Sequence, residues 1–365
     1  MAQSFLEVDL RALEHNFNYL KSKLASHVKF MGVVKAYAYG SDPVAVAKKL
    51  EQLGADYLAV AFTNEGVTLR DAGVRVPILV LHPQPENFEQ IIDRCLEPNI
   101  YSFRVLKAFI ASAESKKQQH YPIHLKFNTG LNRLGFEKGS EAEILEIIAQ
   151  TEAVKIQSLF SHLVASEDLN EKEFTLKQIA DFKTISSNIL AQLDYKPFLH
   201  QSNTSGIINY PEAQFDLVRS GIGLYGYGNT PEEDARLIPV SSLKSVVSQI
   251  HTIKKGESVG YNRGFFAERQ MRTATIPVGH ADGISRAYGK GKGFVIINGK
   301  KASITGNVCM DMIMVDVTDI DCNEGDDVEV FGKESSANKL SAAIGSIPYE
   351  LLTAISQRVK RVIIS

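Results

Sequence analysis

The residue best placed to do chemistry in this sequence is Lys35, which follows a short apolar run at residues 30–34. Residues 40–43 then break the chain and open a helix, with Asp42 expected as its N-cap. The apolar run has the composition of a strand buried on both faces, so Lys35 is expected at the carboxyl end of a parallel strand. Burial there would lower the pKa of its amine and make it a nucleophile that forms Schiff bases. The alternative is an ordinary solvated lysine at a strand end.

Further polar side chains accompany later apolar runs in the same way, namely Arg133, His162 and Arg219. Gly221 and Gly223 follow the last run, and glycines let backbone N–H groups approach a phosphate in the loops after strands seven and eight of a barrel. Each signal is weak alone, because a strand-end histidine is more often a structural hydrogen-bonding residue. Their convergence with a lysine on one face indicates a pyridoxal phosphate site.

These residues can share one site only in a fold that brings strand ends together. Up to about residue 225, predicted strands alternate with predicted helices, which indicates such a fold. Apolar, β-rich runs predict strands at residues 30–34, 57–62, 77–81, 99–103, 123–127, 156–161, 197–202 and 215–225. Amphipathic stretches predict helices at 43–53, 65–72, 87–95, 105–113, 141–150 and 173–193. Eight such units predict an α/β fold with a (β/α)8 TIM-like barrel, and a doubly wound open sheet is the structural alternative.

The hydrophobic pattern of the sequence changes near the polar segment 228–234, beyond which most helical patterns end. Beyond it, alternating runs predict strands at 245–253, 273–277, 293–297, 312–317, 327–331 and 361–364, with one late helix at 349–355. Asn298-Gly299 between two of these runs is a strong hairpin signal. We therefore expect the barrel at residues 1–235 and a β-rich C-terminal domain at 236–365. A strand expected at residues 5–10, before a helix at 11–24, could pack with the second domain.

Composition excludes several other classes of protein. A chain of 365 residues with 44% hydrophobic and 22% charged residues is typical of a soluble globular protein, and a net charge of −2 argues against nucleic-acid and membrane surfaces. We find no apolar run long enough to span a bilayer and expect no signal peptide at Met1–Ser4. Cys95, Cys309 and Cys322 form neither a CxxC pair nor a metal-ligand spacing, so we expect a cytoplasmic protein without a metal site.

Several stretches together resemble the alanine racemase family, in the family's order and spacing. They are Val33–Gly40, Asn128–Phe136, Pro211–Ile222, Gly260–Tyr261, Ala281–Gly283 and Val308–Asp311. The resemblance covers nearly the whole chain. It implies an isomerase that uses pyridoxal 5'-phosphate to interconvert L-alanine and D-alanine, supplying D-alanine for peptidoglycan precursors. It also implies a homodimer in which each barrel mouth is completed by the partner's β-rich domain.

The resemblance further implies a two-base mechanism. Lys35 matches the lysine that holds the cofactor and moves the α-proton on the D-face, and Tyr261 of the partner subunit matches the L-face base. Racemisation needs a base on each face of a planar carbanion, so this pair fits the chemistry. Free tyrosine has a pKa of about 10, and His162, between Tyr261 and Arg219, would tune it. Arg219 matches the partner of the pyridine nitrogen, and because a guanidinium only donates, that nitrogen stays unprotonated and side reactions are suppressed.

The remaining roles follow the same resemblance. The cofactor-binding set is Lys35, Tyr39, His162, Asn203, Thr204, Arg219, Gly221, Ile222 and Tyr349. Arg133 and Met310 match the substrate carboxylate site, and Asp311 matches a support of the same loop. Lys126 matches a lysine that is carbamylated in some members, where it orients Arg133.

Three positions depart from the family's pattern. His280 replaces a tyrosine and Asn307 an arginine at the substrate entrance, while Asn128 replaces an aspartate beside Lys126. The first two leave open a broader racemase that accepts serine as well as alanine. A non-catalytic pyridoxal phosphate carrier is a second alternative, which the second domain and Tyr261 disfavour. A barrel decarboxylase is disfavoured too, because it has an acid in place of Arg219.

Overall fold

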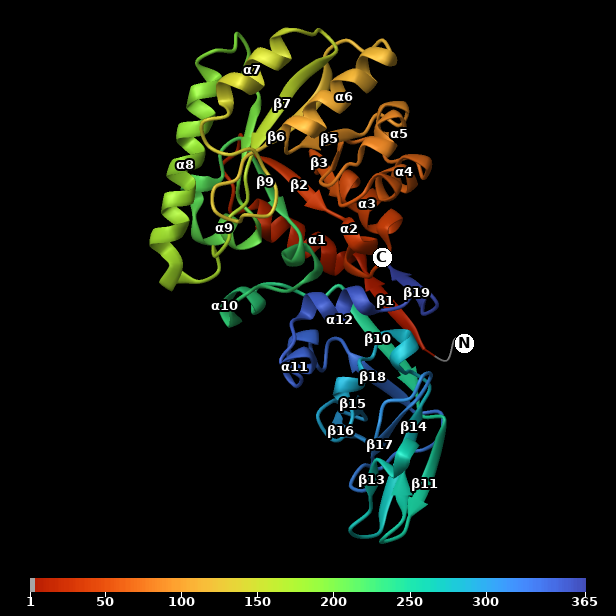
Figure 1. Cartoon of the computed structure of the whole chain (residues 1–365). Helices are drawn as coiled ribbons and strands as arrows, with labels where there is room; N and C mark the ends of the chain where they lie inside the picture. The colour runs from red at the N-terminus through yellow and green to blue at the C-terminus, as the bar shows by residue number, and fades with distance from the viewer. Residues whose placement is uncertain (1–3) are drawn as a thin grey trace.

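The computed structural model describes residues 4–365, so the expectation of no signal peptide lies partly outside the described residues. The first part of the chain forms a parallel eight-stranded barrel, ordered β8-β7-β6-β5-β4-β3-β2-β9 (Figure 1). Its strands are β2 (Lys29–Val33), β3 (Tyr57–Val60), β4 (Ile78–Val80), β5 (Glu97–Ile100), β6 (Tyr121–Lys126), β7 (Val154–Phe160), β8 (Phe198–His200) and β9 (Leu217–Ser220). The backbone N–H of Asp216 donates to Leu199 O at 3.0 Å, and that of Arg219 to Ser202 O at 3.1 Å. These bonds bring the β8 and β9 edges together, so the predicted barrel is confirmed and the open-sheet alternative is wrong.

The helices of this part of the chain mostly cover the outside of the barrel, except that residues 35–39 lie at its mouth and residues 231–234 contact the C-terminal part (Figure 1). They are α1 (Leu10–Lys21), α2 (Lys35–Tyr39), α3 (Pro43–Gln52), α4 (Thr63–Asp71), α5 (Phe88–Asp93), α6 (Phe103–Ser115), α7 (Glu141–Ala149), α8 (Lys172–Leu190), α9 (Thr204–Asn209) and α10 (Pro231–Asp234). α3 begins as predicted, because Asp42 is its N-cap and accepts a hydrogen bond from Ala45 N at 2.8 Å. Pro43 occupies the first helical position, where its missing N–H costs nothing.

The C-terminal part is built on a nine-stranded sheet ordered β11-β14-β17-β16-β15-β18-β10-β1-β19. Its strands are β1 (Phe5–Asp9), β10 (Ser241–Val246), β11 (Gln249–Ile253), β14 (Met271–Ile276), β15 (Phe294–Ile297), β16 (Lys300–Thr305), β17 (Ile313–Asp316), β18 (Asp327–Phe331) and β19 (Lys360–Ile364). β12 (Ser258–Val259) and β13 (Phe265–Phe266) form a separate pair, and α11 (Ala337–Ala342) and α12 (Pro348–Ala354) complete this part. The predicted β-rich C-terminal domain is confirmed.

β1 belongs to the C-terminal sheet although it begins the chain, and Figure 1 shows it beside β19. It runs antiparallel to β10 and parallel to β19. The predicted hairpin also forms, because Asn298 (φ 50°) and Gly299 (φ 73°) turn the chain between β15 and β16. The division of domains at residues 235 and 236 stays a prediction; it falls between α10 and β10.

Some predicted boundaries are wrong, each for a local reason. The run 245–253 is two strands, β10 and β11, which do not pair with each other and are separated by five strands in the order of the sheet. The late helix predicted at 349–355 is present as α12, whereas α11 was not predicted; Gly345 (φ 70°) lies between the two, and Pro348 opens α12. The run 215–225 gives only β9, followed by a 3-10 turn at Ile222–Tyr225.

The C-terminal part reaches the barrel at the loop that follows Lys35. A Cβ on Gly40 would lie 1.9 Å from Leu352 O of α12, so only glycine permits this approach. Arg361 Nη2 donates to Gly40 O at 2.8 Å and ties the start of β19 to the same loop. This contact places Tyr349, on α12, at the mouth of the barrel.

Candidate active site at the barrel mouth

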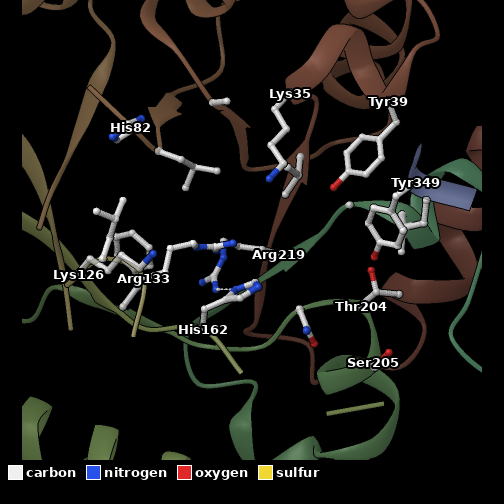
Figure 2. A pocket seen from close by; sticks show the side chains of 18 of the residues that line it. Lys35, Tyr39, His82, Lys126, Arg133, His162, Thr204, Ser205, Arg219 and Tyr349 are labelled. Carbon is white, nitrogen blue, oxygen red and sulfur yellow. Dashed lines mark hydrogen bonds between the residues drawn. The ribbon is translucent and has the colours of Figure 1, made fainter. Parts of the chain in front are cut away.

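The carboxyl ends of the barrel strands enclose a cavity of about 570 Å³. Figure 2 shows Lys35 and Arg219 in its middle, the hydroxyls of Tyr39, Tyr349 and Thr204 on one side, and two further cations on the other. The sequence-predicted residues that line it are Lys35, Tyr39, Lys126, Arg133, His162, Asn203, Thr204, Arg219, Gly221, Ile222 and Tyr349. Parallel strands therefore bring together side chains from widely separated parts of the sequence.

Lys35 opens a left-handed turn rather than ending a strand. Residues 36–39 have φ between 49° and 59°, a conformation that costs about 1–2 kcal/mol for each residue with a Cβ. Glu65 stabilises the turn, because one carboxylate oxygen accepts from Ala36 N at 2.6 Å and the other from Ala61 N at 2.7 Å. The turn directs Lys35 and Tyr39 into the same cavity (Figure 2).

Burial and neighbouring cations shift the amines of the cavity toward their neutral form. Burial lowers the pKa of Lys35 and the charge of Arg133 lowers it further, while Glu65 opposes both. Burial, together with Arg133, Arg219 and Lys35, lowers the pKa of Lys126 to about 7. Lys35 is therefore a partly desolvated amine in a cavity and not the freely solvated lysine of the alternative interpretation.

Arg219 is the most buried charge of the site. Its Nη2 donates to Ser161 O at 2.7 Å, to Gln201 O at 3.2 Å and to Nδ1 of His162 at 3.0 Å. Burial lowers the pKa of Arg219 to about 9, so the guanidinium keeps its proton at neutral pH. Burial and the Arg219 charge hold the pKa of His162 well below its ordinary value, which leaves a neutral imidazole as acceptor.

The opposite side of the cavity carries neutral hydroxyl donors. Burial raises the pKa of Tyr39 well above its ordinary value and that of Tyr349 to about 12, so both phenols stay protonated. Thr204 Oγ1 lies 3.0 Å from the hydroxyl of Ser220, beside the Gly221–Ile222 backbone. Hydroxyl and backbone N–H donors gathered at one end suit an anion such as a phosphate.

Arg133 stands on a loop that Asn128 shapes. The side-chain oxygen of Asn128 accepts from Gly130 N at 3.1 Å and from Asn132 N at 3.0 Å, and its amide donates to Glu137 at 3.0 Å. Asn128 therefore acts as a turn-forming residue here, which accounts for its place near Lys126 without any direct contact with the cavity.

Three predicted site residues lie outside the cavity of their own chain. Tyr261 is 74% exposed and Met310 59% exposed, and Asp311 is exposed beside them on the C-terminal part. Asn307 donates to Tyr261 O at 2.9 Å, and Arg358 holds Asp311 Oδ1 at 2.6 Å. Tyr261 is therefore not among the residues that line the cavity of its own chain, where the tyrosines are Tyr39 and Tyr349.

Sequence reasoning missed several residues of the cavity wall, namely Val33, Ala61, Leu81, His82, Leu134, Phe160, Ser205 and Asn229. His82 could have been found, because it directly follows the predicted strand 77–81. Asn229 could not, because it stands in the polar segment 228–234, which carries no strand or helix pattern, yet its amide donates to Ser205 Oγ at 2.5 Å.

Comparison with known proteins decides the family. The family model for the alanine racemase N-terminal domain matches residues 8–229, and the model for the alanine racemase C-terminal domain matches residues 240–363. The chain belongs to the alanine racemase family. This confirms the predicted resemblance and the predicted enzyme class, a pyridoxal-phosphate-dependent amino-acid racemase.

Similar members span the full length of the chain. An alanine racemase of Thermodesulfovibrio yellowstonii is 37% identical over 97% of this chain and 96% of the relative. One of Helicobacter pylori is 35% identical over 99% of both. Among solved structures, an alanine racemase of Clostridium difficile 630 matches with a TM-score of 0.93 at 33% identity, over 100% of this chain and 96% of that one. The alanine racemase of Bartonella henselae, solved with covalently bound pyridoxal phosphate, matches with a TM-score of 0.90 at 31% identity over 100% of both.

In the described part of the chain, from residue 4 onward, no helix has the length and apolar character needed to cross a membrane.

Proposed function

We propose that this alanine racemase family member interconverts L-alanine and D-alanine with pyridoxal phosphate, using Lys35 of one subunit and Tyr261 of the other as its two bases. The observation that carries the proposal is the placement of Lys35, a desolvated amine that shares one cavity with the Arg219 guanidinium and with the hydroxyls of Tyr39 and Tyr349. An amine for the aldehyde, a partner for the pyridine nitrogen and an anion-binding end are the three groups that this cofactor needs, and here the second of them is a cation.

The residues of the cavity fit the cofactor at each of its ends. Tyr39, Thr204, Tyr349 and the Gly221–Ile222 backbone would hold the phosphate, and Lys35 would hold the aldehyde carbon. Arg219 would face the pyridine nitrogen as a donor only. When bound, pyridoxal phosphate supplies an electron sink that makes the α-proton of an amino acid acidic enough to be moved.

The proton is then moved by residues of the protein. Lys35, with its lowered pKa, has a larger neutral fraction than a solvated lysine and so serves as a base on one face of the substrate. The Arg133 guanidinium would bind the carboxylate of the amino acid through charge-assisted hydrogen bonds. His162, neutral and bonded to Arg219, would accept or donate at the side where a second base enters.

In this proposal the second base comes from another subunit, and the exposure of Tyr261 on the C-terminal part of its own chain supports this. We propose a homodimer in which Tyr261, Met310 and Asp311 complete the partner's barrel mouth. Arg358 supports this surface, since it pairs with Asp282 at 2.7 Å and with Asp311 at 2.6 Å. The loop of Met310 is held as well, because His280 N donates to Cys309 O and Ala281 N to Met310 O, each at 2.9 Å.

The wider role follows from the reaction. D-alanine is a building block of peptidoglycan precursors, so we propose that the enzyme supplies it in the cytoplasm. A carrier without turnover would need only a barrel, and it leaves the whole C-terminal part unexplained. Serine remains a second substrate to test, because His280 and Asn307 stand at the proposed entrance in place of the family's tyrosine and arginine.

The test combines cofactor binding with turnover. The purified protein, reconstituted with pyridoxal phosphate, is expected to show an absorption band that Lys35→Ala loses. Addition of L-alanine in deuterated water is expected to give D-alanine with deuterium at Cα, and L-serine is expected to react more slowly. A bound cofactor without any D-alanine would favour the carrier, and no cofactor binding would overturn the proposal.

A further inference from the structure

A line of hydrogen bonds leaves the buried side of Arg219 and crosses the barrel interior. Arg219 Nη1 lies 2.5 Å from Nδ1 of His200, and Nε2 of His200 lies 2.9 Å from Ser158 Oγ. The same oxygen lies 2.6 Å from Nδ1 of His124, whose Nε2 is 2.7 Å from Glu97 Oε2. We call these five side chains the relay; they come from β9, β8, β7, β6 and β5, one from each of five neighbouring segments of the barrel.

The three inner side chains of the relay are fully buried, while the Glu97 side chain at its end is 12% exposed. His200 is 0% exposed, and His124 and Ser158 are each 1% exposed. His124 precedes Lys126 by two residues, so its side chain points to the same inward face of its strand as Lys126, which lines the cavity. Ser158 precedes the cavity residue Phe160 in the same way. A buried polar group without a partner is costly, and each of these contacts lies within hydrogen-bond distance.

If each of the two rings carries one proton, the two ends of the relay fix where that proton lies. Arg219 can only donate, so Nδ1 of His200 accepts, and the single proton of that neutral ring is on Nε2. That proton is donated to Ser158, whose own hydroxyl proton goes to Nδ1 of His124. The Glu97 carboxylate can only accept, which places the proton of His124 on Nε2 as well. All four hydrogen bonds therefore point the same way, from the cation to the carboxylate.

The direction of the relay matters because Arg219 has no carboxylate beside it. Its hydrogen-bond partners in the described chain are the carbonyls of Ser161 and Gln201 and the two imidazoles of His162 and His200. A buried cation needs compensation, and hydrogen bonds that point in one direction polarise one another. The charge of Glu97 then reaches Arg219 through three intermediate side chains.

We propose that Glu97, His124 and Ser158 are positioning residues that hold His200 as an acceptor and thereby keep Arg219 charged and aimed at the cavity. The consequence for turnover rests on the proposed function, in which Arg219 faces the pyridine nitrogen. The order of the protons along the relay does not rest on the proposed function, since it follows from the residues of the protein alone. A core of purely structural polar groups would need satisfied partners but no common direction.

The direction of the hydrogen bonds is tested by finding which ring nitrogens carry a proton, with nitrogen NMR on the cofactor-free protein with 15N-labelled histidine. The chain has nine histidines, and His124→Gln and His200→Gln assign the two ring systems. We expect both rings to be neutral with the proton on Nε2. A proton on Nδ1, or two protons on either ring, would overturn the proposal.

Coupling along the relay is tested by Glu97→Gln, which keeps shape and an acceptor but removes the charge. We expect it to shift the ring signals of His200 when Ser158 is present and to leave them unchanged in a Ser158→Ala background. Ser158→Thr keeps the hydroxyl and is expected to restore the response. Ser186→Ala is the matched control, because this buried serine of α8 bonds only to backbone carbonyls of its own helix. Identical His200 signals in wild type and Glu97→Gln would refute the coupling.

Turnover supplies the second readout. Glu97→Gln and Ser158→Ala are expected to lower kcat about tenfold, the lower end of what outer-shell partners of a metal ligand contribute, with KM within about twofold. If NMR shows the proton order while kcat stays unchanged, the positioning role is wrong. If the proton order is seen in a protein without racemase activity, the proposed function fails and the relay stands.

Discussion

Gly221 and the hydroxyl of Tyr39 occupy almost the same space. A Cβ on Gly221 would lie 2.2 Å from Tyr39 Oη and 3.0 Å from Cζ. The φ of Gly221 is −110°, so the residue is not in the left-handed region. The glycine is needed because Tyr39 must lie against this loop, where the ring also stacks on Tyr225 with centroids 4.5 Å apart.

Gly221→Ala is therefore expected to push Tyr39 away from the anion-binding end and weaken cofactor affinity, at a cost of about 1–3 kcal/mol typical of overpacking. Cofactor affinity is measured by titrating the cofactor-free protein and following fluorescence. Tyr39→Phe removes the atom that clashes, so the double variant is expected to lose less than the sum of the two single variants. Strictly additive losses would show that the two residues act independently.

Glu65→Ala is expected to release the left-handed turn at residues 36–39. The variant leaves the N–H groups of Ala36 and Ala61 without their carboxylate, which costs about 1–3 kcal/mol for an unsatisfied group. Urea unfolding should show this loss, and the rate of cofactor attachment to Lys35 should fall. Glu65→Gln keeps one oxygen acceptor and is expected to lose less; an unchanged attachment rate in Glu65→Ala would contradict the role of the turn.

The sequence predicted the barrel and the cavity residues better than the local backbone. Lys35, His162 and Arg219 could be placed together because parallel strands put their carboxyl ends at one edge, whatever the exact strand lengths. The left-handed turn after β2 could not be foreseen, because residues 36–39 are alanines and tyrosines, which disfavour positive φ. It is imposed by Glu65, a tertiary contact from the next unit of the barrel.

The hydrogen-bonded relay could not be predicted from the sequence either. His124 and Ser158 stand in the middle of apolar runs, where a single polar residue gives no pattern, and Glu97 precedes the predicted strand 99–103. Their meaning depends on the register between strands, such as the pairing of His124 with Ser158. Register between parallel strands follows from the folded barrel, so only the structure reveals it.

The lowered pKa of Lys126 predicts that the stability of the protein depends on pH in a specific way. Its pKa falls from an ordinary 10.5 to about 7 on folding. Between those two values the unfolded chain binds more protons than the native one, so stability rises with pH across this window, and the penalty for the buried charge is complete below pH about 7. Lys126→Met removes this contribution, so the variant should gain stability relative to wild type at pH 7, by up to a few kcal/mol, and lose that gain by pH 10.

The pH measurement uses urea unfolding of the cofactor-free protein in carbonate-free buffer, because carbamylation of Lys126 would change its charge. Lys107→Met, on the exposed side of α6, is the matched control and should show no such pH-dependent difference. Addition of 13C-labelled bicarbonate to wild type is expected to give a carbamate NMR signal that Lys126→Met lacks. A stability difference between the Lys126 variant and wild type that does not change with pH would show that the Lys126 amine is not desolvated.

Mixed dimers test the division of the two bases between subunits. Lys35 lines the cavity, whereas Tyr261 is 74% exposed on the other part of the same chain. If each site takes Lys35 from one chain and Tyr261 from its partner, Lys35→Ala and Tyr261→Phe homodimers are both nearly inactive, although Tyr261→Phe still binds cofactor. A dimer with one chain of each kind then has one site that lacks both bases and one that is intact.

Co-refolding equal amounts of the two variants is therefore expected to restore about a quarter of wild-type activity, because half of the randomly formed dimers are mixed and each has one working site. Mixing without refolding serves as the control and should restore activity only as fast as subunits exchange. Sedimentation of the refolded sample checks that dimers have formed. If the two bases came from the same chain, every site would lack one of them, and no activity would return however completely the dimers mixed.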